Sequence, residues 1–499
     1  MDKRYYEPIP CGANLPLDNP HAFSVSMPTY QDVVDFEEGK SAVFDLIKTA
    51  YPRLQFHPYV NQVAEFIRVQ KSVSASCTCF VLPSMRFAED VAGLSATTPE
   101  IYAFDGYAIA VFSPEATEAA ANYFAFMKHT GYMIYSREAE DFLRSRGIEL
   151  PEWDEDYNCS NPQEQVVATL HQGYGDADIT LCGSGMNAIY AAYAAVKENS
   201  AAGRDIFIQY GWIYTDSIHI LRKCSNEFHQ IGRVTDLAAL KRYLQENGDR
   251  VAGIITETLS NPLLQTPDLP VLAELARQYQ FTIIIDNTFA TPWNVDVTPY
   301  ADIVVESLTK FAAGKGDCMA GAVIIPAASQ LPAATRQSLQ KFVNPLAGRD
   351  LQRLGATIGG YQERVKQANG NAAVLVDYLE RHPQVKVVHH AYADTGANYG
   401  KMTKGDGCYG GVISFVVNGD FASFYDNLTL PKGPSLGCDF PLAMSYTLLA
   451  HWDLVNDPKQ KVLNDMGISP WLIRLSVGED SPQLIIAAME KAFKVLSAD

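Results

Sequence analysis

The stretch FTIIIDNTFATPWNVDVTPYADIVVESLTK, residues 281–310, contains two short apolar runs that each end in polar residues. The first run ends at Asp286, and the second is followed by Ser307, Thr309 and Lys310. Near-continuous apolar runs of this length are typical of parallel strands that are buried on both faces of a sheet. Because ligands bind beyond the carboxyl ends of such strands, we expect these polar side chains to meet at one edge of an α/β sheet.

The alternation of strands and helices extends over residues 166–345. We expect further strands and helices in the runs ADITLC, NAIYAAYAAVKEN, DIFIQYG, VAGIITET, LPVLAELARQYQ and MAGAVIIP. Strands that alternate with helical patterns indicate crossover units and a mostly parallel sheet. We therefore predict an N-terminal arm over residues 1–60 with one helix near Tyr30–Tyr51, a large α/β domain over residues 61–345, and a smaller α+β domain over residues 346–499.

Residues 86–165 enlarge the predicted large domain. Strands are expected in SASCTCFVLPS (74–84), YAIAVFS (107–113) and YMIYS (132–136), and helices over residues 114–129 and 137–147. The order strand, helix, strand, helix predicts parallel crossover units here as well. The pattern leaves open whether this segment covers the mouth of an active site or builds an assembly surface.

The composition excludes several classes of protein. The chain has 499 residues, of which 47% are hydrophobic and 19% charged, and its formal net charge is −18. A surface this acidic argues against broad binding to nucleic acid or anionic membranes. The nine cysteines include no CxxC pair, so we expect free thiols and no metal site. The start, MDKRYYEPIPCG, lacks the apolar core of a secretory signal, and no run approaches the ~18 apolar residues of a membrane span. These features favour a cytoplasmic protein.

Lys310 lies close after two hydroxyl residues beyond the end of its strand. The hydroxyls of Ser307 and Thr309 suit a phosphate, and the lysine amine can form a Schiff base with an aldehyde. Asp286, at the end of the preceding strand, can hold a pyridine nitrogen protonated. Each residue alone has an ordinary interpretation, since a lysine in a loop is usually exposed and an aspartate before Asn287 often caps a turn.

Three further features lie beyond strand ends. The segment GSGM, residues 183–186, joins a strand to a helix, where free backbone N–H groups bind anions. Tyr210 could stack on a flat heteroaromatic ring, and Asn261 could donate to a phenolate oxygen. The ordinary alternatives are a plain turn, a half-buried tyrosine and a turn residue before Pro262. Together with the two strand ends above, these features describe a pocket for pyridoxal 5′-phosphate (PLP).

In this order, the motifs resemble the Cys/Met-metabolism family of PLP enzymes, the cystathionine γ-synthase group. The matching runs are SGMNAI, YGWIY, ETLSNPLLQTPDL, IIIDNTFATPWN, ADIVVESLTKFAAGKGD and WLIRLSVGED. The runs YPRLQFHPYV, KGPSLG and SYTLLAHW are similar to the longer, fungal-type synthases, which carry an enlargement before Ser-Gly-Met. The resemblance implies a fold-type-I PLP-dependent transferase, assembled as a homodimer or homotetramer with shared active sites.

The resemblance also implies roles for individual residues. Lys310 would bind PLP covalently, Asp286 would pair with the pyridine nitrogen, and Arg474 would hold the substrate α-carboxylate with help from Ser435. A guanidinium fork suits this task because it binds a carboxylate through two parallel hydrogen bonds, which a lysine cannot do. By the same resemblance Tyr210 stacks on the ring and is a candidate acid/base. The remaining cofactor-binding residues implied are Gly185, Met186, Asn261, Ser307 and Thr309.

Tyr51 and Arg53 match a Tyr-x-Arg motif that in the family reaches the phosphate in the neighbouring subunit. The resemblance therefore implies that the arm of one chain completes the site of another, so a monomer should be inactive. The expected partners are other copies of this chain and small amino-acid substrates, rather than nucleic acid or membrane.

The implied reaction is γ-replacement, in which L-cysteine displaces the acyloxy group of an O-acyl-L-homoserine and gives cystathionine (trans-sulfuration, a step of methionine biosynthesis). An O-acylhomoserine sulfhydrylase, a cystathionine or methionine γ-lyase, and a non-catalytic PLP-binding protein remain open. The sequence departs from the family at two positions. Lys315 stands where the common motif has His, but it lacks flanking hydroxyls, so Lys310 remains the predicted covalent lysine. Pro434 replaces a Glu that precedes Ser-Leu-Gly in many cystathionine enzymes, which removes that contact for the distal amine of cystathionine.

Overall fold

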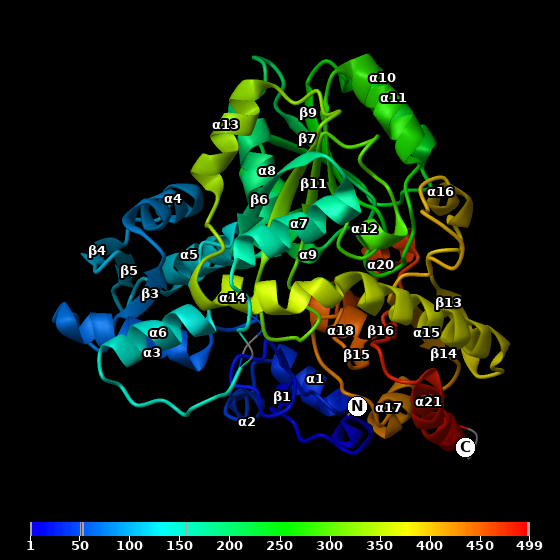
Figure 1. The fold of residues 1–499 in the computed structure, drawn as a ribbon, viewed down its shortest axis with the longest axis horizontal. Helices are drawn as coiled ribbons and strands as arrows, with labels where there is room; N and C mark the ends of the chain where they lie inside the picture. The colour runs from blue at the N-terminus through cyan, green and yellow to red at the C-terminus, as the bar shows by residue number, and fades with distance from the viewer. Residues whose placement is uncertain (1, 50, 52–53, 156, 497–499) are drawn as a thin grey trace.

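A seven-stranded sheet forms the centre of the computed structural model, which describes residues 2–49, 51, 54–155 and 157–496 (Figure 1). The strand order is β6-β12-β11-β10-β9-β7-β8. Strand β12 pairs antiparallel with β6 and β11, and the other neighbouring pairs are parallel. The strands are β6 Ala177–Cys182, β7 Ile206–Tyr210, β8 Glu227–Ile231, β9 Val251–Glu257, β10 Thr282–Asp286, β11 Ile303–Glu306 and β12 Gly321–Pro326. The predicted α/β fold with a mostly parallel sheet is confirmed.

Both faces of this sheet are covered, which explains the near-continuous apolar runs. In β10, Ile283 and Ile285 belong to one hydrophobic core cluster, whereas Ile284 between them belongs to the other. Burying each such side chain contributes about 1.5–3 kcal/mol. The first cluster is closed by α7 Pro162–Tyr174, α10 Leu237–Asn247 and α11 Leu269–Tyr279, and the second by α8 Gly185–Asn199, α9 Thr215–Cys224 and α13 Ala333–Phe342.

The C-terminal part combines helices with a second, antiparallel sheet of order β13-β14-β16-β15. Its strands are β13 Val385–His389, β14 Val412–Val417, β15 Leu442–Ser445 and β16 Ile473–Ser476. The helices are α14 Gly348–Thr357, α15 Tyr361–Arg381, α16 Gly396–Gly400, α17 Phe421–Asn427, α18 Tyr446–Ala450, α19 Trp452–Val455, α20 Lys461–Met466 and α21 Pro482–Leu496. This is the α+β composition expected from the sequence.

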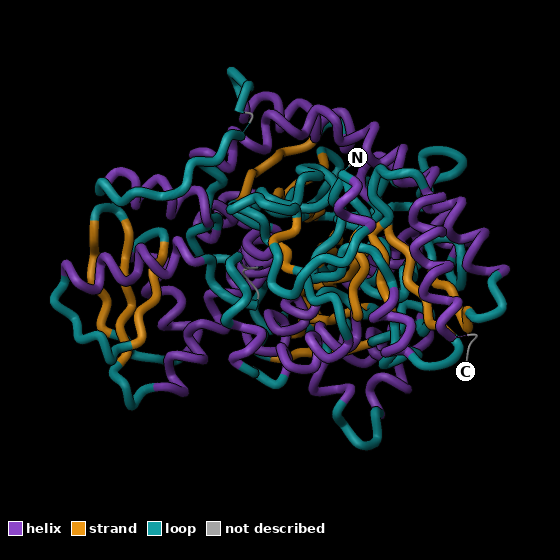
Figure 2. The backbone as a smooth tube through the Cα atoms, turned by 90° about the horizontal axis from the view of Figure 1, so that it is seen from below, coloured by secondary structure: helices purple, strands orange, loops and turns teal. Residues whose placement is uncertain are grey.

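Residues 58–145 form a small lobe at one end of the molecule, with its own antiparallel sheet of order β3-β5-β4 (Figure 2). Its elements are α3 Pro58–Gln70, β3 Thr78–Leu82, α4 Met85–Ser95, β4 Glu100–Phe104, β5 Tyr107–Phe112, α5 Thr117–Thr130 and α6 Ser136–Ser145. The prediction of parallel crossover units was therefore wrong. Strands β4 and β5 form a hairpin across Asp105 and Gly106, whose φ angles of 49° and 89° suit a two-residue turn. Residues 132–135, expected to form a strand, lead into α6 without pairing.

The N-terminal segment packs on the C-terminal part and then approaches the lobe. It contains η1 Lys3–Tyr6, β1 Asn14–Leu15, β2 Ser24–Val25, α1 Tyr30–Glu37 and α2 Ser41–Phe44. The single helix expected near residues 30–51 is divided, because the chain turns at Gly39 with a φ of 72°. Val33 and Phe36 are buried in the same cluster as the C-terminal sheet.

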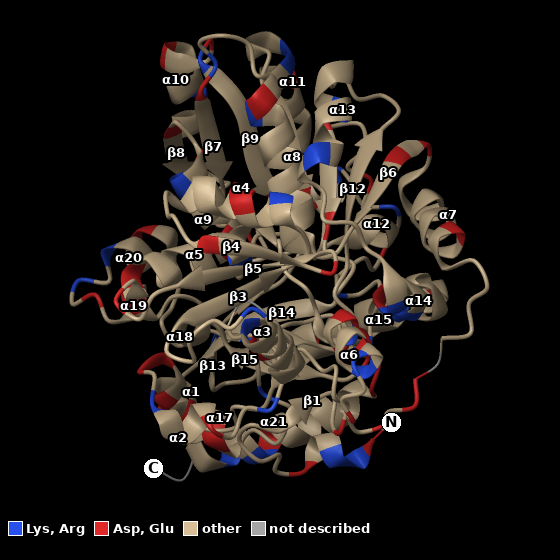
Figure 3. Cartoon of the chain, turned by 90° about the vertical axis from the view of Figure 1, so that its left-hand side faces the viewer, with Lys and Arg blue, Asp and Glu red and all other residues tan. Residues whose placement is uncertain are grey.

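Positions of Lys and Arg and of Asp and Glu alternate along the helices and loops on the side of the molecule that Figure 3 shows. Within the described residues, no helix has both the length and the hydropathy that crossing a membrane requires.

Candidate active site

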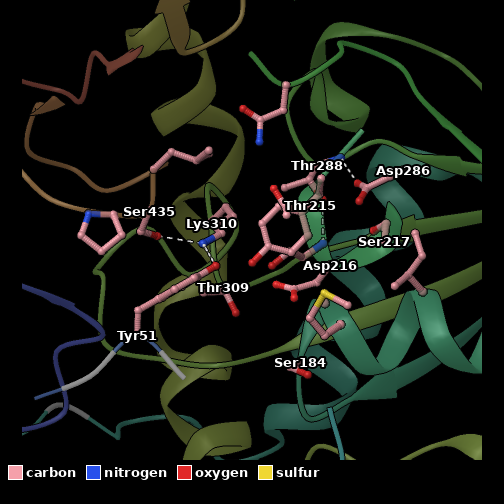
Figure 4. A pocket seen from close by; sticks show the side chains of 18 of the residues that line it. Tyr51, Ser184, Thr215, Asp216, Ser217, Asp286, Thr288, Thr309, Lys310 and Ser435 are labelled. Atoms are coloured by element: carbon pink, nitrogen blue, oxygen red, sulfur yellow. Dashed lines mark hydrogen bonds between the residues drawn. The ribbon is translucent and has the colours of Figure 1, made fainter. Parts of the chain in front are cut away.

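A cavity opens beyond the carboxyl ends of β9, β10 and β11, where the sequence predicted the polar residues to meet (Figure 4). It is lined by Asp286, Ser307, Thr309 and Lys310 from the strand ends. The other predicted residues that line it are Tyr51, Gly185, Met186, Asn261, Ser435 and Arg474. Segments far apart in the chain therefore converge on one site.

Lys310 lies at the centre of these contacts and is only 7% exposed. Its Nζ donates to Ser435 Oγ at 2.8 Å and to the Tyr51 hydroxyl at 3.1 Å (Figure 4). The rings of Tyr51 and Phe23 lie 4.7 and 5.4 Å from Nζ. The amine is thus held in a defined position and points into the cavity rather than into solvent.

Asp286 ends β10 beneath the cavity. Its carboxylate accepts the Thr288 N–H at 2.9 Å. Burial raises the pKa of Asp286, because the charged form has lost its water, and the bond from Thr288 offsets only part of this effect. A cationic ring nitrogen beside this carboxylate would stabilise its charged form.

The N-terminus of α8 and the end of β11 form a cradle for an anion. Ser184 caps the helix and accepts the Asn187 N–H at 3.2 Å. A Cβ atom on Gly185 would lie 2.5 Å from Ser307 Cβ, so only glycine allows this close approach. Thr309 is fixed by Ala320, whose N–H it accepts at 2.9 Å. Helix N–H groups and hydroxyls in one cradle fit a phosphate.

Arg474, on β16, reaches the same cavity from the C-terminal sheet. Its guanidinium donates to Asn261 Oδ1 at 3.0 Å and to the Ser435 carbonyl at 2.8 Å. The ring of Tyr446 lies 5.1 Å from its Cζ. Burial lowers the pKa of Arg474, since the charge is separated from water. A carboxylate ligand would supply the opposite charge to this buried cation.

Glu257 is a site residue that sequence reasoning missed. It ends β9 directly beside Asp286 in the sheet register and lines the cavity. Its carboxylate accepts the Tyr214 N–H at 2.6 Å and the Asn261 N–H at 3.0 Å, so it positions both loops. Burial, and then the charge of Asp286, raise the pKa of Glu257 well above its usual range. A signal was present, because Glu257 is the acid at the end of the run VAGIITE.

Tyr210, the predicted ring platform, does not line the cavity. It belongs to β7 and packs in the core of the sheet, where its hydroxyl donates to the Val234 carbonyl at 2.7 Å. Tyr214, four residues later and just before α9, lines the cavity instead. Tyr210 is the last residue of its strand, as Glu257 and Asp286 are of theirs, so the position at a strand end did not by itself distinguish Tyr210 from Tyr214.

We therefore expect opposite effects from changing these two tyrosines. Tyr214→Ala should weaken PLP binding by about tenfold, because a stacked ring contributes ~0.5–1.5 kcal/mol beyond its buried area. Tyr210→Phe should leave PLP binding unchanged and lower the free energy of unfolding by about 1 kcal/mol, through loss of one hydrogen bond. Equilibrium titration with PLP and thermal unfolding check both. If Tyr210→Phe weakens PLP binding and Tyr214→Ala does not, the assignment to Tyr214 is wrong.

The N-terminal segment contributes to the cavity of its own chain, since Tyr51 contacts Lys310 of the same polypeptide. The resemblance implies that this motif also serves a neighbouring subunit, and that implication stays a prediction. Arg53, the second residue of the predicted motif, lies outside the described residues. Within the residues that are described, no cluster of His, Cys, Asp or Glu could hold a metal ion, and all nine cysteines are free thiols.

These features together fit PLP. The cradle beside Gly185 suits a phosphate, the buried Asp286 suits a cationic ring nitrogen, and the Lys310 amine is joined to Arg474 through Ser435. Comparison with known proteins points to the same cofactor. The model of the family described as "Cys/Met metabolism PLP-dependent enzyme" matches residues 157–494.

Two curated relatives and one solved structure show the range of the similarity. An L-2-amino-4-chloropent-4-enoate dechlorinase/desaturase from Streptantibioticus cattleyicolor is 37% identical, over 95% of this chain and 96% of its own length. A cystathionine gamma-synthase from Neurospora crassa is 34% identical, over 74% of this chain and 59% of its own length. A putative O-acetylhomoserine (thiol)-lyase structure from Campylobacter jejuni, with a pyridoxyl-lysine monophosphate, superposes with a TM-score of 0.58 at 21% identity, covering 73% of this chain and 93% of its own.

Proposed function

Because the chain belongs to the Cys/Met metabolism family of PLP-dependent enzymes, we propose that it acts on an L-α-amino acid that carries a leaving group on its γ-carbon. PLP is the cofactor. Within this class, the proposed reaction is the replacement of the acyloxy group of an O-acyl-L-homoserine by the thiol of L-cysteine, which gives cystathionine. The similarity to a fungal cystathionine gamma-synthase supports this choice.

The observation that carries the proposal is the position of Ser435 between two functional groups. Its hydroxyl accepts a hydrogen bond from Lys310 Nζ, and its carbonyl accepts one from Arg474, both at 2.8 Å. One residue therefore fixes the distance between an amine that can move protons and a guanidinium that can hold a carboxylate. An α-amino acid bound by Arg474 has its Cα close to Lys310.

The proposed roles follow from these positions. When bound, PLP supplies an aldehyde that links to amines and a ring that withdraws electrons from Cα. Arg474 holds the α-carboxylate, and the Lys310 amine takes the proton from Cα and then one from Cβ, so that a Cβ–Cγ double bond forms as the γ-substituent leaves. After the cysteine thiol has bonded to Cγ, the Lys310 ammonium returns the protons to Cβ and Cα. Asp286 keeps a proton on the ring nitrogen. The Tyr51 hydroxyl, 3.1 Å from Lys310 Nζ, can pass a proton to the leaving oxygen.

Elimination without a second substrate is the other candidate, and two observations favour it. The dechlorinase/desaturase is similar to this chain over almost the whole length of both proteins. Pro434 lines the cavity just before Ser435, and the apolar side chains of Leu259, Phe289 and Met444 line it as well. Such a wall suits an uncharged γ-substituent better than the distal amine of cystathionine.

Product analysis separates the two reactions. We expect purified protein incubated with O-acetyl- or O-succinylhomoserine and L-cysteine to give cystathionine, identified by mass. Without cysteine, slow release of 2-oxobutyrate and ammonia is expected from the same enzyme. If 2-oxobutyrate and ammonia are the only products whatever thiol is present, replacement is contradicted and elimination supported. The Lys310→Ala variant serves as the control for uncatalysed hydrolysis.

We also propose that the protein acts in the cytoplasm as a homodimer or homotetramer. The nine free thiols suit a reducing compartment, and the assembly is proposed by analogy with the family. Light scattering of the purified holoenzyme tests the assembly, and a single-chain mass would contradict it.

A further inference from the structure

The lobe of residues 58–145 lies outside the segment that the family model matches, yet it supplies part of the active-site wall. Lys128 lines the cavity from the last turn of α5, and Gly131 lies just beyond the end of that helix. Met133 and Tyr135 line the cavity from the loop that follows.

The end of α5 is packed against the phosphate cradle. A Cβ atom on Gly131 would lie 2.7 Å from the Asn187 backbone nitrogen and 2.7 Å from Ser184 Oγ, both in the first turn or cap of α8. Asn187 further bonds the Thr130 carbonyl at 3.0 Å. The C-terminal turn of α5 is therefore fixed directly against the N-terminus of α8.

A second contact fixes α5 to α9. The His129 ring, next to Lys128, lies 3.1 Å from an Asp216 carboxylate oxygen, and both side chains are buried. Asp216 itself lines the cavity (Figure 4). An acidic side chain in a cavity that receives a phosphate raises the electrostatic cost of that phosphate, so a cation is needed nearby.

Among the described residues that line the cavity, the lysines and arginines are Lys128, Lys310 and Arg474. Lys310 is the proposed covalent residue, and Arg474 lies at the Ser435 side of the cavity with Asn261. Lys128 lines the cavity from α5, whose end packs against the N-terminus of α8. The Lys128 Nζ lies 4.6 Å from the centre of the Phe124 ring, one turn earlier on α5, so a cation–π contact holds the ammonium group.

We propose that Lys128 binds the 5′-phosphate of PLP, so that the lobe of the same chain is part of the cofactor site. The inference rests on the proposed position of the phosphate at Gly185 and Ser307. An ammonium group is a compact charge that pairs with a phosphate without a fixed geometry, which suits a residue on a neighbouring helix. The affinity for PLP would then depend on how the lobe packs against the large domain, because that packing holds Lys128 in place.

Binding of PLP and of pyridoxal, which lacks the phosphate, tests this role. In the full-length chain freed of cofactor, Lys128→Met should raise the Kd for PLP about tenfold and leave the Kd for pyridoxal within twofold. Lys128→Arg should restore most of the PLP affinity. Lys223→Met is the matched control, because Lys223 lies over Phe126 of the same helix but is exposed and outside the cavity.

Three outcomes would overturn the inference. They are an unchanged Kd for PLP in Lys128→Met, an equal loss of affinity for PLP and pyridoxal, and an equal effect of Lys223→Met. Ser307→Ala, measured in parallel, separates this inference from the proposed site. If Ser307→Ala weakens PLP but not pyridoxal while Lys128→Met has no effect, only the role of Lys128 fails. If neither variant discriminates between the two ligands, the position of the phosphate fails as well.

Discussion

Replacing Lys310 by alanine is expected to remove turnover by about four orders of magnitude or more, since the variant loses both the covalent attachment of PLP and the proton-transfer group. The visible absorption band of the lysine-bound cofactor should disappear at the same time. The fold should remain, because the change removes one amine from a cavity and leaves the strand β11 before it intact. Steady-state rates, absorption spectra and thermal unfolding measure these three quantities.

Lys315 provides the matched control for this experiment. It lies five residues further on, is paired with Asp439 at 2.5 Å, and does not line the active-site cavity. Lys315→Ala should therefore keep the absorption band and most of the activity. A colourless Lys315→Ala variant beside a coloured, active Lys310→Ala variant would reverse the assignment of the covalent lysine.

Arg474→Lys is expected to lower kcat/KM by about 100- to 1000-fold, which corresponds to ~2.7–4 kcal/mol of lost transition-state stabilisation. Lysine keeps the charge but cannot form two parallel bonds to a carboxylate. It also cannot donate at once to Asn261 and to the Ser435 carbonyl, as the guanidinium does. The loss should appear mainly in KM if the carboxylate is held equally in the ground state and the transition state.

A substrate analogue without the α-carboxyl group tests whether the carboxylate is the group that Arg474 binds. The native enzyme should process this amine poorly, and Arg474→Lys should reduce the remaining rate little further. An Arg474→Lys variant that lowers the rates with both substrates by the same factor would show a structural role instead. PLP titration of the variant serves as a control, because its cofactor affinity should remain unchanged.

The local pattern of the sequence was sufficient for the central sheet and for the residues at its strand ends. Ile283 and Ile285 face one side of the sheet and Ile284 faces the other, and both sides are covered. A strand buried on both faces has apolar residues at successive positions, and this run is visible in the sequence. Asp286 follows that run, and the hydroxyls before Lys310 follow the next. Because the carboxyl ends of parallel strands meet at one edge, chain position alone brought these residues together.

The same local reasoning gave wrong predictions for the tyrosines around the end of β7 and for the strand pairing in the lobe. Tyr210 and Tyr214 are separated by one short loop, and the sequence did not show that the first packs in the core and the second lines the cavity. In the lobe, Asp105-Gly106 marked a hairpin that the sequence interpretation passed over. The pairing of β3 with β5 spans a helix and another strand, so no local pattern contained it.

By itself, then, the sequence determined the α/β fold, the cofactor and the strand-end residues, because strand periodicity and the chemistry of a strand end are properties of adjacent residues. Only the tertiary structure decided that Tyr51 and Lys128 line the cavity, and that Ser435 joins Lys310 to Arg474. These contacts link residues 39 to 259 positions apart in the chain. These contacts form only when whole helices and strands pack together. That packing depends on many contacts between residues far apart in the chain, so no short run of residues predicts it.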